Sequence, residues 1–161
     1  MVTRDWKFWM EVEIGGVPKE QLITNLENEG FLVEGCVKSM IRQDAFTVIP
    51  EKRVLRLARC TVRDLGFAKS PTTTQLKRCI VELGGQFCPA ELGPHLRLHL
   101  KNQERRDDFS LVMEQILVPD SALVVFHLVR DDGGRQWLVP HSANPRGRWF
   151  LGHKVVFVLA S

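Results

Sequence analysis

The stretch LVVFHLVRDDGGRQWLV, residues 123–139, predicts a β-hairpin and favours an antiparallel sheet. Residues 123–129 are almost all apolar and have the length of a buried strand. Residues 131–134 read Asp-Asp-Gly-Gly, residue types that tolerate the positive φ angles of tight hairpin turns. Residues 137–139 are apolar again and are expected to pair back onto the first strand.

Further segments with strand character lie on both sides of this hairpin. From Pro94 onward the apolar period is two, which predicts a half-buried strand with alternate residues on opposite faces. Its apolar face would carry Leu96, Leu98 and Leu100, and its polar face His95, Arg97, His99 and Lys101. The other predicted strands are residues 6–14, 45–49, 54–60, 109–116 and 155–159.

Helical signals are concentrated in the first half. Residues 18–29 and 33–42 carry apolar residues at helical spacing. Thr72 and Gln75 form a capping-box pattern that predicts a third helix, ending before Gly84. We therefore predict an α+β fold with a mainly antiparallel sheet from the C-terminal half, packed with two to three helices from the N-terminal half. Residues 1–161 are expected to form a single α+β domain, with a seam, if any, near 66–71.

Length and composition set limits on the class of protein. The chain has 161 residues, of which 44% are hydrophobic and 25% charged, so a disordered tail, a collagen-like fibre and a coiled-coil rod are excluded. No segment approaches the roughly 20 apolar residues of a membrane span. Residues 1–6 lack the apolar segment of a signal peptide, so we expect a cytoplasmic protein.

Basic and aromatic residues are concentrated near the C-terminus, although the net charge of the whole chain is only +3. No acidic residue follows Asp132. A basic surface with interleaved aromatic rings can bind phosphates or stack bases. The alternative is a solvated strand edge whose cations prevent aggregation. The predicted binding residues are Arg135, Trp137, His141, Arg146, Arg148 and Trp149.

Catalytic signatures are weak. Cys88 precedes Pro89, and a thiol at a helix N-terminus can become nucleophilic, although a buried structural cysteine is the alternative. Glu91 and Glu114 could act as a carboxylate pair, or could instead cap a turn and pair with Arg97. The weak catalytic candidates are therefore Cys88, Glu91 and Glu114.

Metal and cofactor sites are not expected. The four cysteines form no Cys-x-x-Cys pair and are expected to be free. On a strand, His95 and His99 would lie about 13 Å apart, too far to share a metal ion. The chain contains no glycine-rich phosphate loop of the Walker or dinucleotide type, so no cofactor is predicted.

One segment resembles a known family. Residues 88–98, Cys-Pro-Ala-Glu-Leu-Gly-Pro-His-Leu-Arg-Leu, resemble a family of small bacterial hypothetical proteins of unknown function, together with residues 64–67, 74–76, 83–84, 113–114, 149 and 156–157. The resemblance extends from about Gly16 to the end of the chain. It implies a soluble bacterial protein and no catalytic role, and small proteins of this kind also occur as products of mobile gene cassettes. Family members often carry Gln at position 95, which argues against an essential His95.

Three functional hypotheses follow from these observations. The first is a non-catalytic module that binds a protein or a small anionic ligand through the acid-free C-terminal surface. The second is a small hydrolase-like enzyme with a cleft near Cys88, Glu91 and Glu114. The third is a DNA-associated regulator that uses the two N-terminal helices, although Lys38 and Arg42 are the only cations on the second of them. No membrane partner is expected, and the protein would be a monomer or a homodimer.

Overall fold

The predicted hairpin is formed by β7 (Leu123–Arg130) and β8 (Gln136–Ser142). In the computed structural model, which describes residues 8–160, the two strands pair antiparallel with Leu128 opposite Leu138. The Asp131 carboxylate accepts the Arg135 backbone N–H at 2.9 Å, and Gly134 adopts a φ of 82°. The turn therefore uses the residue types that the sequence indicated, and the hairpin prediction is confirmed.

Within residues 8–160 the sheet has nine strands. Antiparallel pairs predominate, while β5 with β9 and β2 with β8 are parallel. The main path runs β1 (Phe8–Ile14), β3 (Arg53–Thr61), β9 (Lys154–Leu159), β5 (Asp108–Leu111), β7, β8 and β2 (Leu32–Val33). Two short strands lie off this path, with β4 (Gly85–Gln86) paired to β9 and β6 (Ile116–Leu117) paired to β7.

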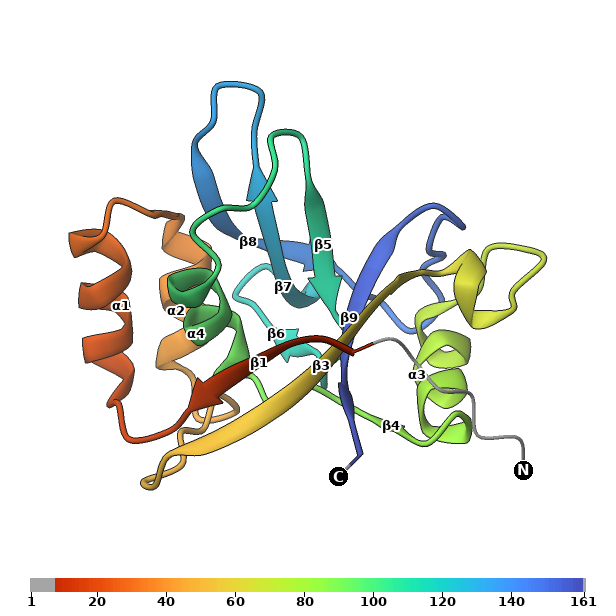
Figure 1. The fold of residues 1–161 in the computed structure, drawn as a ribbon, viewed down its shortest axis with the longest axis horizontal. Coiled ribbons are helices and arrows are strands. Elements are labelled where there is room, and N and C mark those ends of the chain that lie inside the picture. The colour runs from red at the N-terminus through yellow and green to blue at the C-terminus, as the bar shows by residue number, and fades with distance from the viewer. Residues whose placement is uncertain (1–7, 161) are drawn as a thin grey trace.

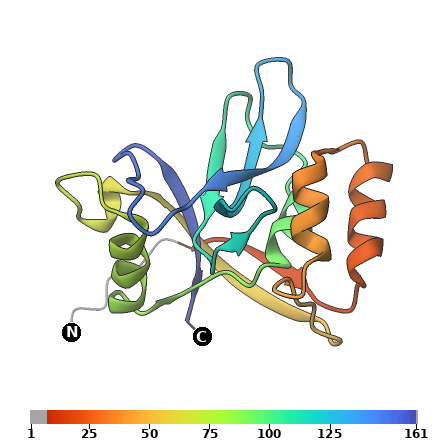
Figure 2. The ribbon, with the colours of Figure 1, turned by 180° about the vertical axis from the view of Figure 1, so that it is seen from behind.

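The helices form two groups. On one side, α1 (Lys19–Asn28), α2 (Gly35–Arg42) and α4 (Leu92–His99) lie together, and α4 contacts β1, β7 and β8 (Figure 1). On the other side, α3 (Thr73–Glu82) lies alone beside β9 and the loop that precedes it, as the view from behind also shows (Figure 2). A short 3₁₀ turn (Arg63–Leu65) connects β3 to the loop before α3.

The capping box at the start of α3 is confirmed. The Gln75 backbone N–H donates to the Thr72 hydroxyl at 3.2 Å, and the Thr72 N–H donates to the Gln75 side-chain oxygen at 2.9 Å. Both bonds satisfy amide groups that have no partner within the helix. The loop before β9 is hydrogen-bonded to this helix start, which holds the loop in place.

The predicted fold class is correct as α+β, but the division by halves of the chain is wrong. β1 and β3 belong to the first half and form one end of the sheet, while α4 belongs to the second half. Their apolar residues are the reason: Val12, Ile14, Leu55 and Leu57 are buried. Because β1 and β3 bury these apolar side chains, they form part of the sheet, which is therefore not confined to the C-terminal segments.

Residues 94–99 belong to helix α4, so the strand predicted from Pro94 onward is wrong. Pro94 occupies an early position of α4, where a missing N–H costs nothing. The alternation was misleading because Arg97, assigned to the polar face, is completely buried. Leu96 and Leu100 are buried one turn apart, as a helix requires. Residues 45–49 also form no strand, and Trp6, the first residue of the predicted 6–14 strand, lies outside the described residues.

The core is continuous through β9, whose residues 155–158 are all buried because the strand has neighbours on both edges. Among the residues that the structure describes, no helix has the length and apolar character needed to cross a bilayer.

Candidate functional site

The register of four strands brings three histidines together. Ser110 on β5 lies directly opposite His127 on β7 and, on its other edge, opposite Val155 on β9. His153 lies two residues before Val155 and therefore on the same face of the sheet. His141 on β8 is the diagonal neighbour of His127, since His127 pairs with Val139.

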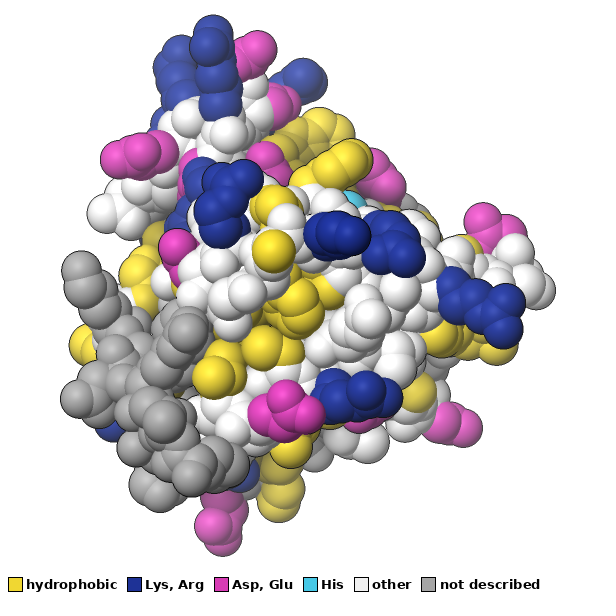
Figure 3. Space-filling view, turned by 90° about the vertical axis from the view of Figure 1, so that its right-hand side faces the viewer, with side chains coloured by type: hydrophobic (Ala, Val, Ile, Leu, Met, Phe, Trp, Pro, Cys, Tyr) yellow, Lys and Arg dark blue, Asp and Glu magenta, His cyan; other side chains and the backbone are white. Residues whose placement is uncertain are grey.

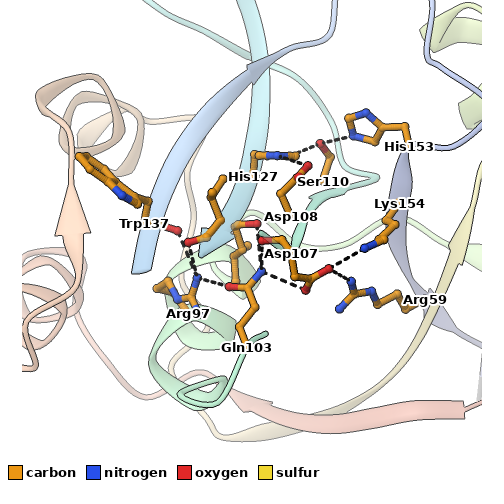
Figure 4. A network of polar contacts seen from close by, with 12 residues as sticks. Arg59, Arg97, Gln103, Asp107, Asp108, Ser110, His127, Trp137, His153 and Lys154 are labelled. Carbon is orange, nitrogen blue, oxygen red and sulfur yellow. Dashed lines mark hydrogen bonds and ion pairs between the residues drawn. The ribbon is translucent and has the colours of Figure 1, made fainter. Parts of the chain in front are cut away.

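A chain of hydrogen bonds connects this cluster (Figure 4). His153 Nε2 lies 2.9 Å from Ser110 Oγ, and the same oxygen lies 2.6 Å from His127 Nδ1. His127 Nε2 in turn lies 2.9 Å from a carboxylate oxygen of Asp108. Asp108 and Ser110 are two residues apart on β5, so both side chains point to the same face.

The donors and acceptors in this chain follow from the carboxylate. An ionised carboxylate only accepts, so Asp108 requires the proton of His127 to be on Nε2. The remaining nitrogen of a neutral His127 must accept, and Ser110 therefore donates its hydroxyl proton to Nδ1. Ser110 Oγ then accepts the Nε2 proton of His153. This order leaves His153 Nδ1 as an unprotonated acceptor.

The imidazoles are held in the neutral form. The pKa values of His127 and of His153 are lowered to about 4, mainly by burial and to a smaller extent by the charge of neighbouring histidines. Burial also lowers the pKa of His141. The rings contact one another, with the centroids of His127 and His141 5.1 Å apart and those of His141 and His153 4.8 Å apart. A proton on one ring therefore disfavours a proton on the next.

Trp149 completes the cluster. Its ring centroid lies 5.2 Å from that of His141 and 4.9 Å from that of His153. The indole N–H donates to the Thr73 hydroxyl at 2.8 Å, and the Trp149 backbone N–H donates to the Pro71 carbonyl at 2.9 Å. Both bonds hold the loop between β8 and β9 on the capped start of α3.

These groups border a cavity of about 370 Å³, which we call the histidine pocket. Its volume is within the range of small-molecule sites. Among the described residues, the His141 side chain contacts other rings but makes no hydrogen bond. The imidazole of His141 therefore offers one donor and one acceptor to a ligand. The lining residues are Asp108, His127, His141, Ser142, Gly147, Arg148, Trp149, Phe150 and His153.

A second polar network lies behind the pocket, at the bottom of the same view (Figure 4). Asp107 accepts hydrogen bonds from Arg59, from Lys154 at 2.8 Å and from the Gln103 side chain at 3.2 Å. Gln103 also accepts from Arg97 at 2.8 Å. Asp107 precedes Asp108, and Lys154 follows His153, so this network fixes the backbone on two sides of the pocket.

The residues of the histidine pocket have the types of a serine hydrolase triad but not its accessibility. Ser110, His127 and Asp108 are connected in the order that activates a nucleophilic serine. Ser110 is completely buried, however, and its oxygen is engaged by two imidazoles. A serine nucleophile needs an open approach for the substrate carbonyl. We therefore assign to Ser110 the role of orienting the two histidines that it contacts.

Half of the predicted binding residues meet in the histidine pocket. His141, Arg148 and Trp149 line it. Arg135 and Trp137 instead lie on the β7–β8 hairpin, where both side chains bond the Asp131 carboxylate at 3.0 Å. The remaining residue of the six, Arg146, is exposed in the loop between β8 and β9.

The three weak catalytic candidates have different environments. Cys88 is buried, and burial raises the pKa of its thiol far above the usual range. Glu91 is also buried and accepts the Ile49 backbone N–H at 3.0 Å. Glu114 is largely exposed and forms an ion pair with Lys77 at 3.0 Å. These side chains therefore lack the common open cleft that joint catalysis would need.

The N-terminal helices carry few free cations. Lys38 is paired with Glu27 at 3.2 Å, and Arg42 with Glu20 at 2.7 Å. Both cations of α2 are thus engaged with α1, and the charge available for a DNA backbone is small.

The geometry gives no support for a metal centre. In the described part of the chain, no three His, Cys, Asp or Glu side chains are placed to hold a metal ion. Both nitrogens of His127 are already engaged by Ser110 and Asp108. His95 and His99 lie on α4 and not on a strand, so the predicted separation of about 13 Å is wrong. His95 Nε2 lies 3.5 Å from a carboxylate oxygen of Glu91, and His99 is exposed.

Four residues of the site were not singled out from the sequence: Asp108, Ser110, His127 and His153. One signal was present, since His127 interrupts an otherwise apolar strand. A polar residue at such a position needs a buried partner. The identity of that partner depends on strand pairing, which the sequence does not specify.

Comparisons with protein-family models, with curated proteins and with solved structures gave no match for this chain.

Proposed function

We propose that the protein is a non-catalytic binding module and that it takes a small anionic ligand into the histidine pocket. The observation that carries this proposal is the unpartnered imidazole of His141 in a cavity of about 370 Å³. His141 is partly exposed, so its ring nitrogens are open to the pocket and not sealed in the core. Small-molecule sites usually combine aromatic walls with a few polar groups that can bond the ligand, as the rings and the His141 nitrogens do here.

The charge at the pocket entrance favours an anion. Arg148 is exposed at the rim, and its Nη1 donates to the Ser70 carbonyl at 2.7 Å. That bond orients the guanidinium while leaving other N–H groups free for a ligand. The carboxylate of Asp108 is engaged by His127, so it is directed at the imidazole. Neutral histidines below this rim can donate or accept without adding charge of their own.

The experiment is a titration of the intact chain with two small anions, inorganic phosphate and benzoate, followed by ¹⁵N NMR of the histidine rings. We expect at least one anion to shift the His141 and His153 resonances saturably. Arg148→Ala and His141→Ala should each weaken that binding by about tenfold, the value of one charge-assisted hydrogen bond.

The matched control is Arg53→Ala, which removes an exposed arginine from the other end of the sheet. It should leave the titration unchanged. If neither anion moves the ring resonances at millimolar concentration, or if the shifts persist in both pocket variants, the proposed function is wrong.

A further inference from the structure

A second cavity adjoins the histidine pocket and has a different chemistry. It measures about 510 Å³, and we call it the basic pocket. Three cations line it, Lys69, Arg78 and Arg148, against one acid, Glu82. Among the described residues, neither Lys69 nor Arg78 forms an ion pair, and both are exposed. Unpaired cations that converge on one hollow favour a dianionic group such as a phosphate.

Arg148 belongs to both pockets and forms the boundary between them. Its Nη1 bonds the carbonyl of Ser70, a lining residue of the basic pocket, at 2.7 Å. Its backbone pairs with Thr72 in an isolated antiparallel bridge. The guanidinium is therefore held in place between the two cavities, where it can contact groups in either one.

The histidine pocket supplies the surface for a flat ring. Phe150 lines it and is 78% exposed, the largest value among the exposed bulky apolar residues of the described chain. The face of this ring is open at the pocket mouth, where a planar ligand ring can stack on it. The exposed face of Phe150 is the stacking surface, while His141 lies partly exposed in the same lining and Trp149, in ring contact with His141, is buried. Stacking on such faces accepts any planar ring.

The face that carries α3 shows how these features are distributed. Lys and Arg side chains lie around a patch of apolar side chains, and a histidine reaches the surface beside basic side chains (Figure 3). The basic pocket lies on this face, since Gln75, Arg78 and Glu82 belong to α3. A ligand that spans both cavities would thus combine a ring at one end with negative charge at the other.

We propose that the two pockets form one elongated site for a planar heterocycle that carries a phosphate group, as in a nucleotide. The ring stacks on Phe150 in the histidine pocket with its edge toward His141, and the phosphate lies among Lys69, Arg78 and Arg148. This inference rests on the proposed function, since it names the class of anionic ligand whose ring enters the histidine pocket while Arg148 at its rim contacts the phosphate. His141 would read the edge of the ring through its free nitrogen atoms.

The test compares four probes on the intact chain by isothermal titration calorimetry: adenosine monophosphate, adenosine, inorganic phosphate and a short single-stranded oligonucleotide. We expect the monophosphate to bind at least about tenfold more tightly than adenosine or phosphate alone, because only it engages both pockets. The oligonucleotide carries the same kinds of ring and phosphate group as the monophosphate. Tighter binding of the oligonucleotide, with a strong salt dependence, would identify the end of a strand as the source, and tighter binding of the monophosphate would identify the free nucleotide.

Variants separate the two ends of the site. Lys69→Ala combined with Arg78→Ala should weaken the monophosphate by at least about tenfold and leave adenosine binding unchanged. Phe150→Ala should weaken adenosine and the monophosphate and leave inorganic phosphate unchanged. The charge-matched control is Lys52→Ala with Arg53→Ala, two exposed cations at the opposite end of β3. It should have no effect on any probe.

Failure of this inference can be distinguished from failure of the proposed function. If phosphate or benzoate still shifts the histidine rings but the monophosphate binds no more tightly than phosphate, the two-pocket site is refuted and the anion site stands. The two-pocket site is also refuted if the Lys69 and Arg78 double variant binds the monophosphate normally. If no anion shifts the rings, both proposals are wrong.

Discussion

Ser110 Oγ lies 2.6 Å from His127 Nδ1, and these two residues are directly opposite each other on β5 and β7. The contact joins residues 17 positions apart and closes the centre of the histidine cluster. Because the same oxygen also contacts His153 at 2.9 Å, one hydroxyl links the tautomer of His127, which Asp108 sets, to that of His153. Ser110 is therefore a positioning residue for the site.

Ser110→Ala should destabilise the protein by about 1–3 kcal/mol, because it leaves two imidazole nitrogens without a partner in a buried place. Urea unfolding monitored by circular dichroism measures this change. Ser142→Ala is the control, since Ser142 is an exposed residue at the rim of the same pocket. Equal stability of the two variants would show that the hydroxyl does not hold the rings.

The free energy of unfolding should depend on pH through the buried histidines. The pKa of His127 is about 4 in the folded protein and 6.5 in the reference state. The unfolded chain therefore binds the proton more readily between these values, so stability falls as pH decreases from about 6.5 to 4. For His127 the loss is on the order of 2 kcal/mol after allowance for its remaining solvent contact.

Urea titrations at a series of pH values provide the measurement. The slope of stability against pH in this window should be shallower for His127→Gln than for the native chain. His99→Gln is the control, because His99 is exposed on α4. An identical slope for the native chain and His127→Gln would mean that the folded protein tolerates a charge at this position.

Gly93 on α4 cannot accept a side chain without displacement of its neighbour. A Cβ atom at this position would lie 2.6 Å from the Phe126 ring, which is completely buried on β7. Gly93→Ala should therefore destabilise the protein by about 1–3 kcal/mol through overpacking. Gly35→Ala on α2 is the matched control, because nothing lies within 4 Å of its Cβ position. Thermal unfolding should show a lower midpoint for the first variant and an unchanged or higher one for the second.

Arg97 is the polar centre of the contact between α4 and the hairpin. Its Nη2 donates to Leu100 O and to the Gln136 side chain, both at 2.6 Å. Arg97→Lys should destabilise the protein by about 3 kcal/mol, because an ammonium cannot reproduce the planar fork of donors in a buried place. Arg53→Lys, at an exposed position, is the control. Calorimetric unfolding with equal midpoints for both variants would contradict this role.

Cysteine reactivity offers an independent test of the catalytic alternative. Burial raises the pKa of both Cys88 and Cys36, but Cys88 is buried whereas the thiol of Cys36 is only partly buried and open to a reagent. Brief treatment of the folded chain with iodoacetamide should therefore label Cys36 and spare Cys88, as peptide mass spectrometry can show. Rapid labelling of Cys88 under native conditions would reopen its role as a nucleophile.

Local features of the fold were predictable from the sequence where the cause is local. The Asp131–Gly134 turn and the Thr72–Gln75 capping box depend on residues within four positions of each other. Residues 94–100 were not predictable in the same way. Their alternation suits a strand, but burial of Arg97 against acceptors on Leu100, Gln103 and Gln136 makes the helix the better solution.

The candidate site shows the same division. Arg148 and Trp149 were predicted because basic and aromatic residues cluster near the C-terminus of the sequence. Ser110, His127 and His153 were not, because they come from three separate segments. Asp108 likewise has no sequence motif that links it to His127.

Local chemistry accounts for the Asp131–Gly134 turn and the capping box of α3, because both depend on backbone preferences and short-range hydrogen bonds. Which strands are neighbours is settled only when the chain folds. Placing β5 between β9 and β7 puts Ser110 within reach of both His127 and His153. Strand order depends on how buried faces fit together over long sequence separations, so the histidine pocket exists only in the folded chain.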